Sequence, residues 1–279
     1  MLTRTLILNG RTWTVHEGGE ASGPAMLMLH GFTGSGRNWE ELAKKLNGWR
    51  IIAPDLPGHG GTAAPTGTMP EVARDLEALL DQMGVPEALV IGYSMGGRLA
   101  LHFAVQAPQR VLGLVIIGAT PGMPDAAARA ERVAADEALA RKIEADYATF
   151  VRDWEEQSLF ATQKAMSPAS QEQIRAIRRS HQPEALAAAL RGMGTGSQSP
   201  LHDKLGTLTM PVLWVVGEYD QKFRAIADAV HPLLPEARFA VLPYAGHAVH
   251  LERPSAFKTL LLSFIEQLPV PASPRRSDA

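Results

Sequence analysis

A short apolar run that leads into a Gly-x-Ser-x-Gly turn constrains the fold of this chain more than any other feature. Residues 89–91 are Leu-Val-Ile, residues 92–96 are Gly-Tyr-Ser-Met-Gly, and a segment with helical character follows. Strand, sharp turn and helix in this order project a serine above the end of the strand, beside the first amides of the helix. The two glycines suit a place where strand and helix approach closely. We therefore expect Ser94 to be a nucleophile or base in a tight backbone conformation.

Strand and helix patterns alternate on both sides of this turn. Apolar runs occur at 25–29, 49–53, 89–91, 111–117, 212–216 and 238–242, and helical spacing at 39–46, 69–83, 225–234 and 254–268. Continuous apolar runs are typical of strands buried on both faces, and strand–helix alternation indicates a parallel sheet with right-handed crossovers. Asn9-Gly10 predicts a hairpin that adds strands 5–8 and 12–16 at one edge. The sequence thus predicts an α/β-hydrolase fold, a mostly parallel twisted sheet with helices on both faces.

The alternation stops in the middle of the chain. From Pro124 to about Met193 there are no strand-like runs, and the segment is rich in Ala, Arg, Glu and Gln at helical spacing. We expect a helical cap over the active edge of the sheet. The predicted organisation is a core at 1–121, a cap at 122–205, the second part of the core at 206–268 and a flexible tail rich in Pro, Ser and Arg at 269–279.

Composition excludes several classes of function. The chain has 279 residues, a formal net charge of −2 and no cysteine. Disulfides, thiolate metal sites and a cysteine nucleophile are therefore excluded, and neither nucleic acid nor a membrane is an expected partner. The first ten residues lack the pattern of a secretory signal. We expect a soluble, cytoplasmic enzyme.

A serine needs a histidine to take its proton and an acid to hold that histidine, and in this fold they follow in the order Ser, Asp/Glu, His. Asp220 comes just after the run at 212–216, and His247 follows the last strand. We assign Ser94, Asp220 and His247 as a catalytic triad. Glu218 is an alternative acid, although Asp220 lies further past the strand end, and His250 is an alternative base. The loop histidines, His30 and His59, have no paired acid in the right chain order and form no metal-binding motif.

Two further features concern the substrate. The backbone amides of Phe32 and Met95 are the expected oxyanion hole, and loss of one such donor costs about 3 kcal/mol. Arg98 lies one helical turn after Ser94 and is expected at the pocket floor. The cap is also rich in arginine, and a few arginines that point inward would favour a polycarboxylate, where a lipase pocket would be apolar.

Five segments resemble one family in particular, the 2-succinyl-6-hydroxy-2,4-cyclohexadiene-1-carboxylate synthases of menaquinone biosynthesis. The resemblance covers roughly residues 26–268. It is carried by Leu-His-Gly-Phe-Thr-Gly-Ser-Gly at 29–36, Gly-Tyr-Ser-Met-Gly-Gly-Arg at 92–98, Gly-Thr-Gly-Ser-Gln at 194–198, Gly-Glu-Tyr-Asp-Gln-Lys-Phe at 217–223 and Gly-His-Ala-Val-His-Leu-Glu at 246–252. The arginine after the double glycine, the Gly-Thr-Gly-x-Gln segment and the Lys-Phe pair are its more specific parts.

The resemblance implies a lyase on a hydrolase fold. Such an enzyme eliminates pyruvate from 2-succinyl-5-enolpyruvyl-6-hydroxy-3-cyclohexene-1-carboxylate, a small-molecule polycarboxylate, without water, metal or cofactor. Ser94 would act as the base. The substrate-binding residues that it implies are Tyr93, Arg98, Arg132, Trp154 and Arg178. Arg129 competes with Arg132 for its role, and Arg179 competes with Arg178.

The chain departs from the family after Gln198, where Ser-Pro-Leu-His replaces the usual Ser-Leu-Trp. This change affects cap packing or marks a relative with a shifted substrate. The alternatives are a serine hydrolase of the same fold, either an esterase or a carbon–carbon bond hydrolase, and a non-catalytic binding protein. An intact triad argues against the binding protein, and arginines in the pocket argue against a hydrolase of neutral esters.

Overall fold

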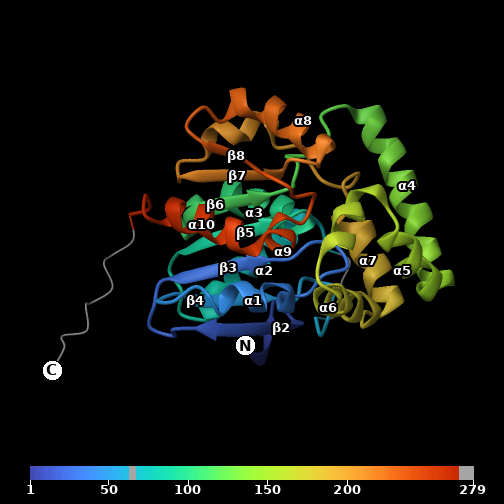
Figure 1. The fold of residues 1–279 in the computed structure, drawn as a ribbon, viewed down its shortest axis with the longest axis horizontal. Coiled ribbons are helices and arrows are strands. Elements are labelled where there is room, and N and C mark those ends of the chain that lie inside the picture. Colours follow the sequence, from blue (N-terminus) through green and yellow to red (C-terminus); the bar gives the residue numbers. More distant parts are fainter. Residues whose placement is uncertain (63–66, 270–279) are drawn as a thin grey trace.

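An eight-stranded sheet lies at the centre of the protein in the computed structural model, which describes residues 1–62 and 67–269 (Figure 1). The strand order is β1-β2-β4-β3-β5-β6-β7-β8. The strands are β1 (Leu2–Leu8), β2 (Arg11–Gly19), β3 (Ala25–Leu29), β4 (Arg50–Pro54), β5 (Ala88–Tyr93), β6 (Val111–Ile117), β7 (Val212–Gly217) and β8 (Arg238–Leu242). Pairing is antiparallel from β1 to β4 and parallel from β4 to β8. This sheet confirms the predicted architecture, including the Asn9-Gly10 hairpin at its edge.

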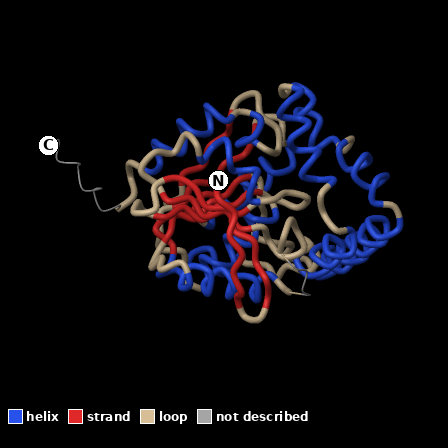
Figure 2. Tube along the Cα trace, turned by 90° about the horizontal axis from the view of Figure 1, so that it is seen from below, coloured by secondary structure: helices blue, strands red, loops and turns tan. Residues whose placement is uncertain are grey.

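Helices cover both faces of the sheet, which Figure 2 shows as blue tubes on either side of the red strands. One core cluster packs α2 (Met69–Gln82), α3 (Met95–Gln106) and α8 (Gln221–Val230) onto one face. The other packs α1 (Glu40–Ala43), α9 (Val249–Glu252) and α10 (Pro254–Ile265) onto the opposite face. Side chains alternate between the faces along each strand, so Leu27 belongs to the first cluster and Met28 to the second.

Two helix predictions were wrong in extent. The segment 39–46 was expected to be one helix, but it divides into a 3-10 turn, η1 (Gly36–Trp39), and the four-residue α1. The helix expected at 225–234 begins earlier, at Gln221. The cause is local, because the side chain of Asp220 accepts a hydrogen bond from the amide of Phe223 at 3.3 Å and caps the helix.

A helical segment lies between β6 and β7, at one end of the strands (right in Figure 1). It consists of α4 (Ala126–Ala145), α5 (Tyr147–Glu155), η3 (Ser158–Ala165), α6 (Pro168–Arg179), α7 (Pro183–Met193) and η4 (His202–Thr207). Its helices share a small core of their own, in which Ile143, Phe150 and Leu186 are buried. We call residues 122–205 the cap. Most of the tail expected at 269–279 lies outside the described residues. Within the described ranges, the helices are all too short or too polar to cross a membrane.

Candidate active site

The turn between β5 and α3 holds Ser94 in the left-handed region, at φ 52° and ψ −110°. Such a conformation is costly for a residue with a side chain and persists where its surroundings fix it. The amide of Ser94 donates to the carbonyl of Ile117 on the neighbouring strand at 2.8 Å. A Cβ on Gly92 would strike the carbonyl of Gly96, and a Cβ on Gly96 would strike that of Leu29. The glycines therefore allow the close approach that aims the serine away from the sheet.

Ser94, His247 and Asp220 form a continuous hydrogen-bonded chain. His247 Nδ1 lies 2.6 Å from Asp220 Oδ2, and His247 Nε2 lies 3.1 Å from Ser94 Oγ. The Asp220 carboxylate accepts a hydrogen bond from the proton on Nδ1, so the lone pair of Nε2 is free to accept the serine proton. Both partners are buried, and the ring of Phe223 packs against the imidazole with centroids 4.5 Å apart. This geometry suits a serine activated by a general base.

The alternative acid and base lie elsewhere. The carboxylate of Glu218 accepts a hydrogen bond from the amide of Tyr244 at 2.8 Å. His250 is buried and stacks on Trp39 with centroids 4.4 Å apart, and neither of its ring nitrogens has a partner among the described residues. Burial, followed by the neighbouring His247, lowers the pKa of His250 to about 3. It is therefore a neutral packing residue at physiological pH.

The loop after β3 brings Phe32 to the same cavity as Ser94 and Met95. Two hydrogen bonds to the carbonyl of Gly31 shape this loop, from Gly34 N at 2.9 Å and from His30 Nδ1 at 2.8 Å. A Cβ on Gly31 would come within 2.7 Å of the Tyr93 ring, so only glycine fits there. The arrangement is compatible with an oxyanion hole formed by the amides of Phe32 and Met95.

A cavity of about 360 Å³ opens beside Ser94, between the sheet and the cap. Its walls combine apolar and aromatic side chains with three cations, and such a mixture suits a ligand of small-molecule size. The aromatic residues on its walls are Phe32, Tyr93, Trp154, Phe160 and Phe223, and the cations are Arg98, Arg132 and Lys222.

Arg98 is the most deeply buried of these cations, with 8% of its surface exposed. Its Nη1 donates to the carbonyl of Met193 at 2.8 Å and lies 3.5 Å from Oε1 of Gln198. Gln198 in turn donates to the carbonyl of Thr120 at 3.3 Å. Burial, and then the charge of Arg132, lowers the pKa of Arg98 to about 10. The guanidinium therefore remains charged at neutral pH, and it forms no ion pair with a carboxylate among the described residues.

Arg132 and Arg129 both come from the first turns of α4 but differ in position. Arg132 lines the cavity and pairs with Asp136 at 2.7 Å. Arg129 instead donates to the carbonyls of Met123 and Pro124 at 2.8 and 2.7 Å and is not on the cavity wall. The structure thus favours Arg132 over its competitor.

Arg178 is buried but does not line the main cavity. It lies against a smaller neighbouring cavity, behind the ring of Phe160, over which its guanidinium sits at 4.9 Å. It pairs with Glu155 at 3.5 Å and donates to Gln163 at 3.1 Å. Arg179 is exposed, so it is the weaker candidate of the two. The three arginines therefore do not all converge above Ser94, since only Arg98 and Arg132 share its cavity.

Sequence reasoning missed Lys222 as a site residue, although its Lys-Phe pair was noted as a motif. Lys222 lines the cavity and its Nζ has no ion-pair partner among the described residues. Desolvation in the cavity, and then Arg132, lowers its pKa. Its place two residues after the triad aspartate was the available signal. Phe160 was also missed, because nothing in its helical sequence context distinguishes a cavity wall from a cap core.

Within residues 1–62 and 67–269, no group of three or more His, Asp or Glu side chains is arranged to hold a metal ion.

Comparisons with known proteins place this geometry in a family. The profile of the alpha/beta hydrolase fold matches residues 24–254. A protein of Bacillus subtilis (strain 168), provisionally named a 2-succinyl-6-hydroxy-2,4-cyclohexadiene-1-carboxylate synthase, is 38% identical over 94% of this chain and 97% of its own. The synthase of that name from Salmonella paratyphi C (strain RKS4594) is 36% identical over 86% of this chain and 93% of its own.

Solved structures agree. MenH from S. aureus superposes with a TM-score of 0.85 and 31% identity, covering 91% of this chain and 97% of that one. An esterase from Exiguobacterium antarcticum, at 22% identity and a TM-score of 0.82, covers 95% of this chain and all of its own, and shares the fold alone. The identity and coverage of the synthases, together with the triad and the cationic cavity, lead to one conclusion. The chain belongs to the 2-succinyl-6-hydroxy-2,4-cyclohexadiene-1-carboxylate synthase family of the α/β-hydrolase fold.

Proposed function

We propose that this protein is a lyase that eliminates pyruvate from 2-succinyl-5-enolpyruvyl-6-hydroxy-3-cyclohexene-1-carboxylate, giving 2-succinyl-6-hydroxy-2,4-cyclohexadiene-1-carboxylate for menaquinone biosynthesis. The observation that carries the proposal is the presence of Arg98, Arg132 and Lys222 in the cavity that contains Ser94. The substrate carries carboxylates on the succinyl chain, the ring and the enolpyruvyl group. Cations held in a confined cavity bind such groups strongly.

In this mechanism Ser94 gives its proton to His247 and takes the ring proton next to the succinyl carbonyl. The electron pair of the broken carbon–hydrogen bond is delocalised onto the carbonyl oxygen, where the amides of Phe32 and Met95 stabilise the oxyanion. The enolate then collapses: its electron pair shifts through the ring double bond and breaks the carbon–oxygen bond to the enolpyruvyl group. The leaving enolpyruvate takes the proton that His247 received and tautomerises to pyruvate, so Ser94 and His247 return to their starting states and no water is consumed.

The remaining residues hold the substrate. Arg98 and Lys222 approach from the core and Arg132 approaches from the cap, so a bound polycarboxylate joins the two parts of the protein. Burial raises the pKa of Tyr93, which keeps its hydroxyl protonated beside the serine. The indole Nε1 of Trp154 has no partner among the described residues and is available to an acceptor on the substrate. Arg178 is proposed to act from the smaller cavity, behind Phe160.

The decisive assay measures pyruvate release from the freshly prepared enolpyruvyl substrate, with p-nitrophenyl acetate as the ester control. The proposal expects rapid release by the native protein and its loss in Ser94→Ala. Brisk ester turnover without pyruvate release above background would reject the lyase and support the second candidate, a serine hydrolase.

That second candidate has one observation in its favour, because the hydrogen-bonded Ser94, His247 and Asp220 serve ester hydrolysis equally well. Arg98 argues against it. A buried guanidinium without a carboxylate partner is costly, and a neutral ester offers nothing that repays this cost.

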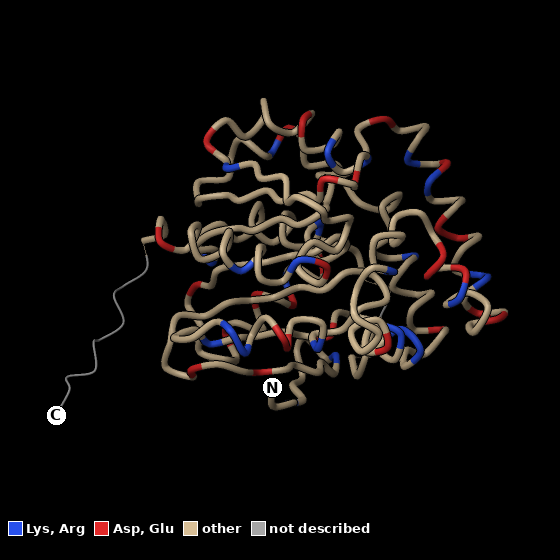
Figure 3. Tube along the Cα trace, in the orientation of Figure 1, with Lys and Arg blue, Asp and Glu red and all other residues tan. Residues whose placement is uncertain are grey.

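We further propose that the enzyme acts in the cytoplasm on a small-molecule polycarboxylate and engages neither nucleic acid nor membrane. Positive and negative side chains are interspersed along the chain (Figure 3), and the formal net charge is −2. A chain with this charge balance is not expected to attract polyanions.

A further inference from the structure

His181 lies in the short connection between α6 and α7 and joins the cap to two loops of the core. Its Nε2 lies 3.0 Å from the carbonyl oxygen of Thr33, and its Nδ1 accepts a hydrogen bond from the amide of Gly60 at 3.1 Å. Only 4% of its surface is exposed. Both ring nitrogens are thus committed to the backbone of the core.

The two backbone partners fix the protonation state of this ring. An amide nitrogen is always a donor, so Nδ1 must present its lone pair to Gly60. The proton then resides on Nε2 and is donated to Thr33. An imidazolium has no lone pair and would lose the bond to Gly60. The link therefore needs neutral His181, and burial lowers the pKa of His181 in keeping with that state.

Thr33 is the residue after Phe32, whose amide is the proposed oxyanion donor. Thr33 has a φ of 63°, in the left-handed region that is unfavourable for a β-branched residue. The hydrogen bond from His181 is made to the carbonyl of this residue, so it supports the turn that aims the Phe32 amide. The ring of Phe32 is also held between His59 of the core and Trp154 of the cap, with centroids 5.6 and 5.5 Å apart.

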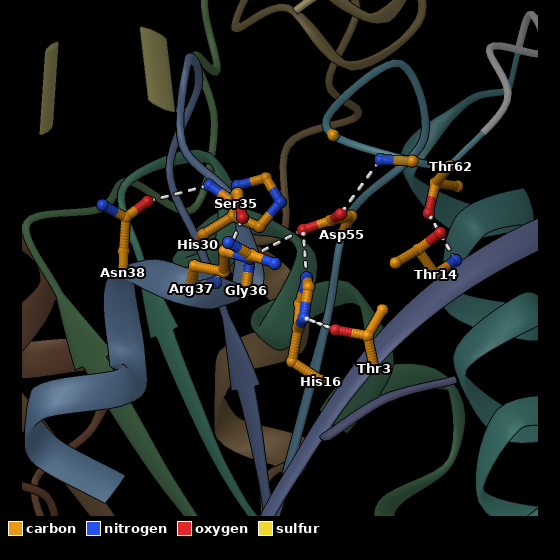
Figure 4. A network of polar contacts seen from close by, with 12 residues as sticks. Thr3, Thr14, His16, His30, Ser35, Gly36, Arg37, Asn38, Asp55 and Thr62 are labelled. Carbon is orange, nitrogen blue, oxygen red and sulfur yellow. Dashed lines mark hydrogen bonds and ion pairs between the residues drawn. The ribbon is translucent and has the colours of Figure 1, made fainter. Parts of the chain in front are cut away.

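The core side of the same loops is fixed by Asp55, which lies at the centre of the polar network in Figure 4. Its Oδ1 accepts from Gly36 N at 2.9 Å and from His16 Nε2 at 3.2 Å, and its Oδ2 accepts from Gly61 N at 3.0 Å. The amide of the preceding residue, Gly60, donates its hydrogen bond to His181 Nδ1. Asp55 therefore anchors both loops within the core, and His181 adds the cap to that network.

We infer that His181 is a positioning residue, which holds the oxyanion loop in its catalytic conformation through Thr33 and docks the cap through Gly60. The inference rests on the proposed function for the role of the Phe32 amide. Since an oxyanion hole serves ester hydrolysis as well as enolate formation, the role of His181 does not depend on which reaction the enzyme performs.

Few other ionisable groups face this ring. The rings of His59 and His30 form a row with it, with centroids 5.3 Å apart between His181 and His59 and 5.0 Å between His59 and His30. Burial lowers the pKa of His30 to about 4 and places that of His59 well below its ordinary value. Asp55 is the nearby anion. The row is thus uncharged at neutral pH, and protonation of one ring opposes protonation of the next.

Two substitutions separate the halves of the link. In His181→Gln the side-chain amide nitrogen reaches about the position of Nε2 and retains the bond to Thr33. In His181→Asn the amide oxygen lies about where Nδ1 was and retains the bond to Gly60 only. We expect His181→Asn and His181→Ala to lower kcat for pyruvate release by about 10- to 100-fold. KM should change less, and His181→Gln should recover most of kcat. His231→Gln, at an exposed histidine that does not line the cavity, is the matched control.

The same variants are assayed with p-nitrophenyl acetate, and the tautomer of His181 is read from long-range 1H–15N spectra of the native protein. Absence of pyruvate release by the native protein would reject the proposed function but leave the ester assay to test His181. Equal kcat values for the Gln and Asn variants, or a native His181 protonated on Nδ1 at pH 7, would overturn the inference. Should His181→Ala fail to fold, the comparison of Gln with Asn still decides.

Discussion

Arg98, in the first helical turn after Ser94, donates a 2.8 Å hydrogen bond to the carbonyl of Met193, the last residue of cap helix α7. The side chain of Arg98 therefore links α3, the helix that follows Ser94, to the cap. Its remaining guanidinium donors are available to the cavity that it lines. A substrate carboxylate bound by Arg98 would reinforce a link between core and cap that already exists in the free enzyme.

Replacing this residue tests both functions. Arg98→Met leaves the buried carbonyl of Met193 without its hydrogen-bond donor. It also removes the guanidinium that would bind a substrate carboxylate, and each loss amounts to about 1–3 kcal/mol. We expect kcat/KM for pyruvate release to fall at least about 100-fold. Arg98→Lys should lose less, since a lysine offers a charge but not the planar fork.

Arg110 supplies the matched control, because it also donates to main-chain carbonyls, those of Pro86 and Val85, but lies away from the cavity. Arg110→Lys should lower the melting temperature without changing kcat/KM. Equal kinetic losses in the two lysine variants would show that Arg98 acts through stability alone.

Asp220→Asn tests the identity of the acid. An amide in place of the carboxylate stabilises the wrong tautomer of His247 and cannot support its positive charge, an effect of about 10⁴-fold on kcat in a comparable triad. Glu218→Gln should retain native kcat, since the Glu218 carboxylate accepts a hydrogen bond from the amide of Tyr244 and not from His247. Steady-state kinetics of both variants check this prediction, and the reverse order of losses would reassign the acid.

The positions of the triad could be predicted because each member follows an apolar run that is recognisable as a strand in the sequence. Ser94 sits in its glycine turn, Asp220 follows β7 and His247 follows β8. Parallel strands end at the same edge of a sheet, so chain order alone brings the three residues together.

A helical cap was expected from the sequence, but the orientation of its helices could not be predicted in the same way. In the longest cap helix, α4, only Asp136, Ala140 and Ile143 are buried, and nothing in the spacing of the cap helices says which face meets the sheet. Arg178 was expected to bind the substrate, and which cap arginines face the cavity was left open. In the structure it pairs with Glu155 and lies behind Phe160, a contact between two cap segments. The role of His181 was invisible for a related reason, because both of its partners are backbone groups of loops more than a hundred residues earlier in the chain.

Lys222 allows a test of substrate binding that stability does not confound. It has no ion-pair partner among the described residues, and desolvation, followed by the nearby charge of Arg132, lowers its pKa. Lys222→Met should therefore leave the melting temperature unchanged or raise it, while KM rises about 10-fold through the loss of one carboxylate contact. Lys222→Arg should keep most of the affinity.

Lys204→Met is the control for this pair, since Lys204 is an exposed lysine outside the cavity. Thermal unfolding and initial-rate measurements provide the two readouts. A native KM in Lys222→Met would exclude Lys222 from the carboxylate site.

His250 makes the stability of the fold dependent on pH. Its pKa is lowered to about 3 by burial, so the folded state holds it neutral while the unfolded chain protonates it near pH 6.5. Above pH 6.5 neither state protonates His250, so it adds no pH dependence. As the pH falls from 6.5 toward 3, only the unfolded chain binds this proton, and the free energy of unfolding falls by up to about 1.4 kcal/mol per pH unit.

His250→Phe keeps the stack on Trp39 without a titrating group. The free energy of unfolding, measured by urea denaturation from pH 7 to pH 4, should fall less steeply in this variant, whereas His231→Phe at an exposed site should follow the native curve. Identical slopes in the native protein and His250→Phe would mean that His250 is protonated in the folded state, against the unpartnered nitrogens in its packed environment.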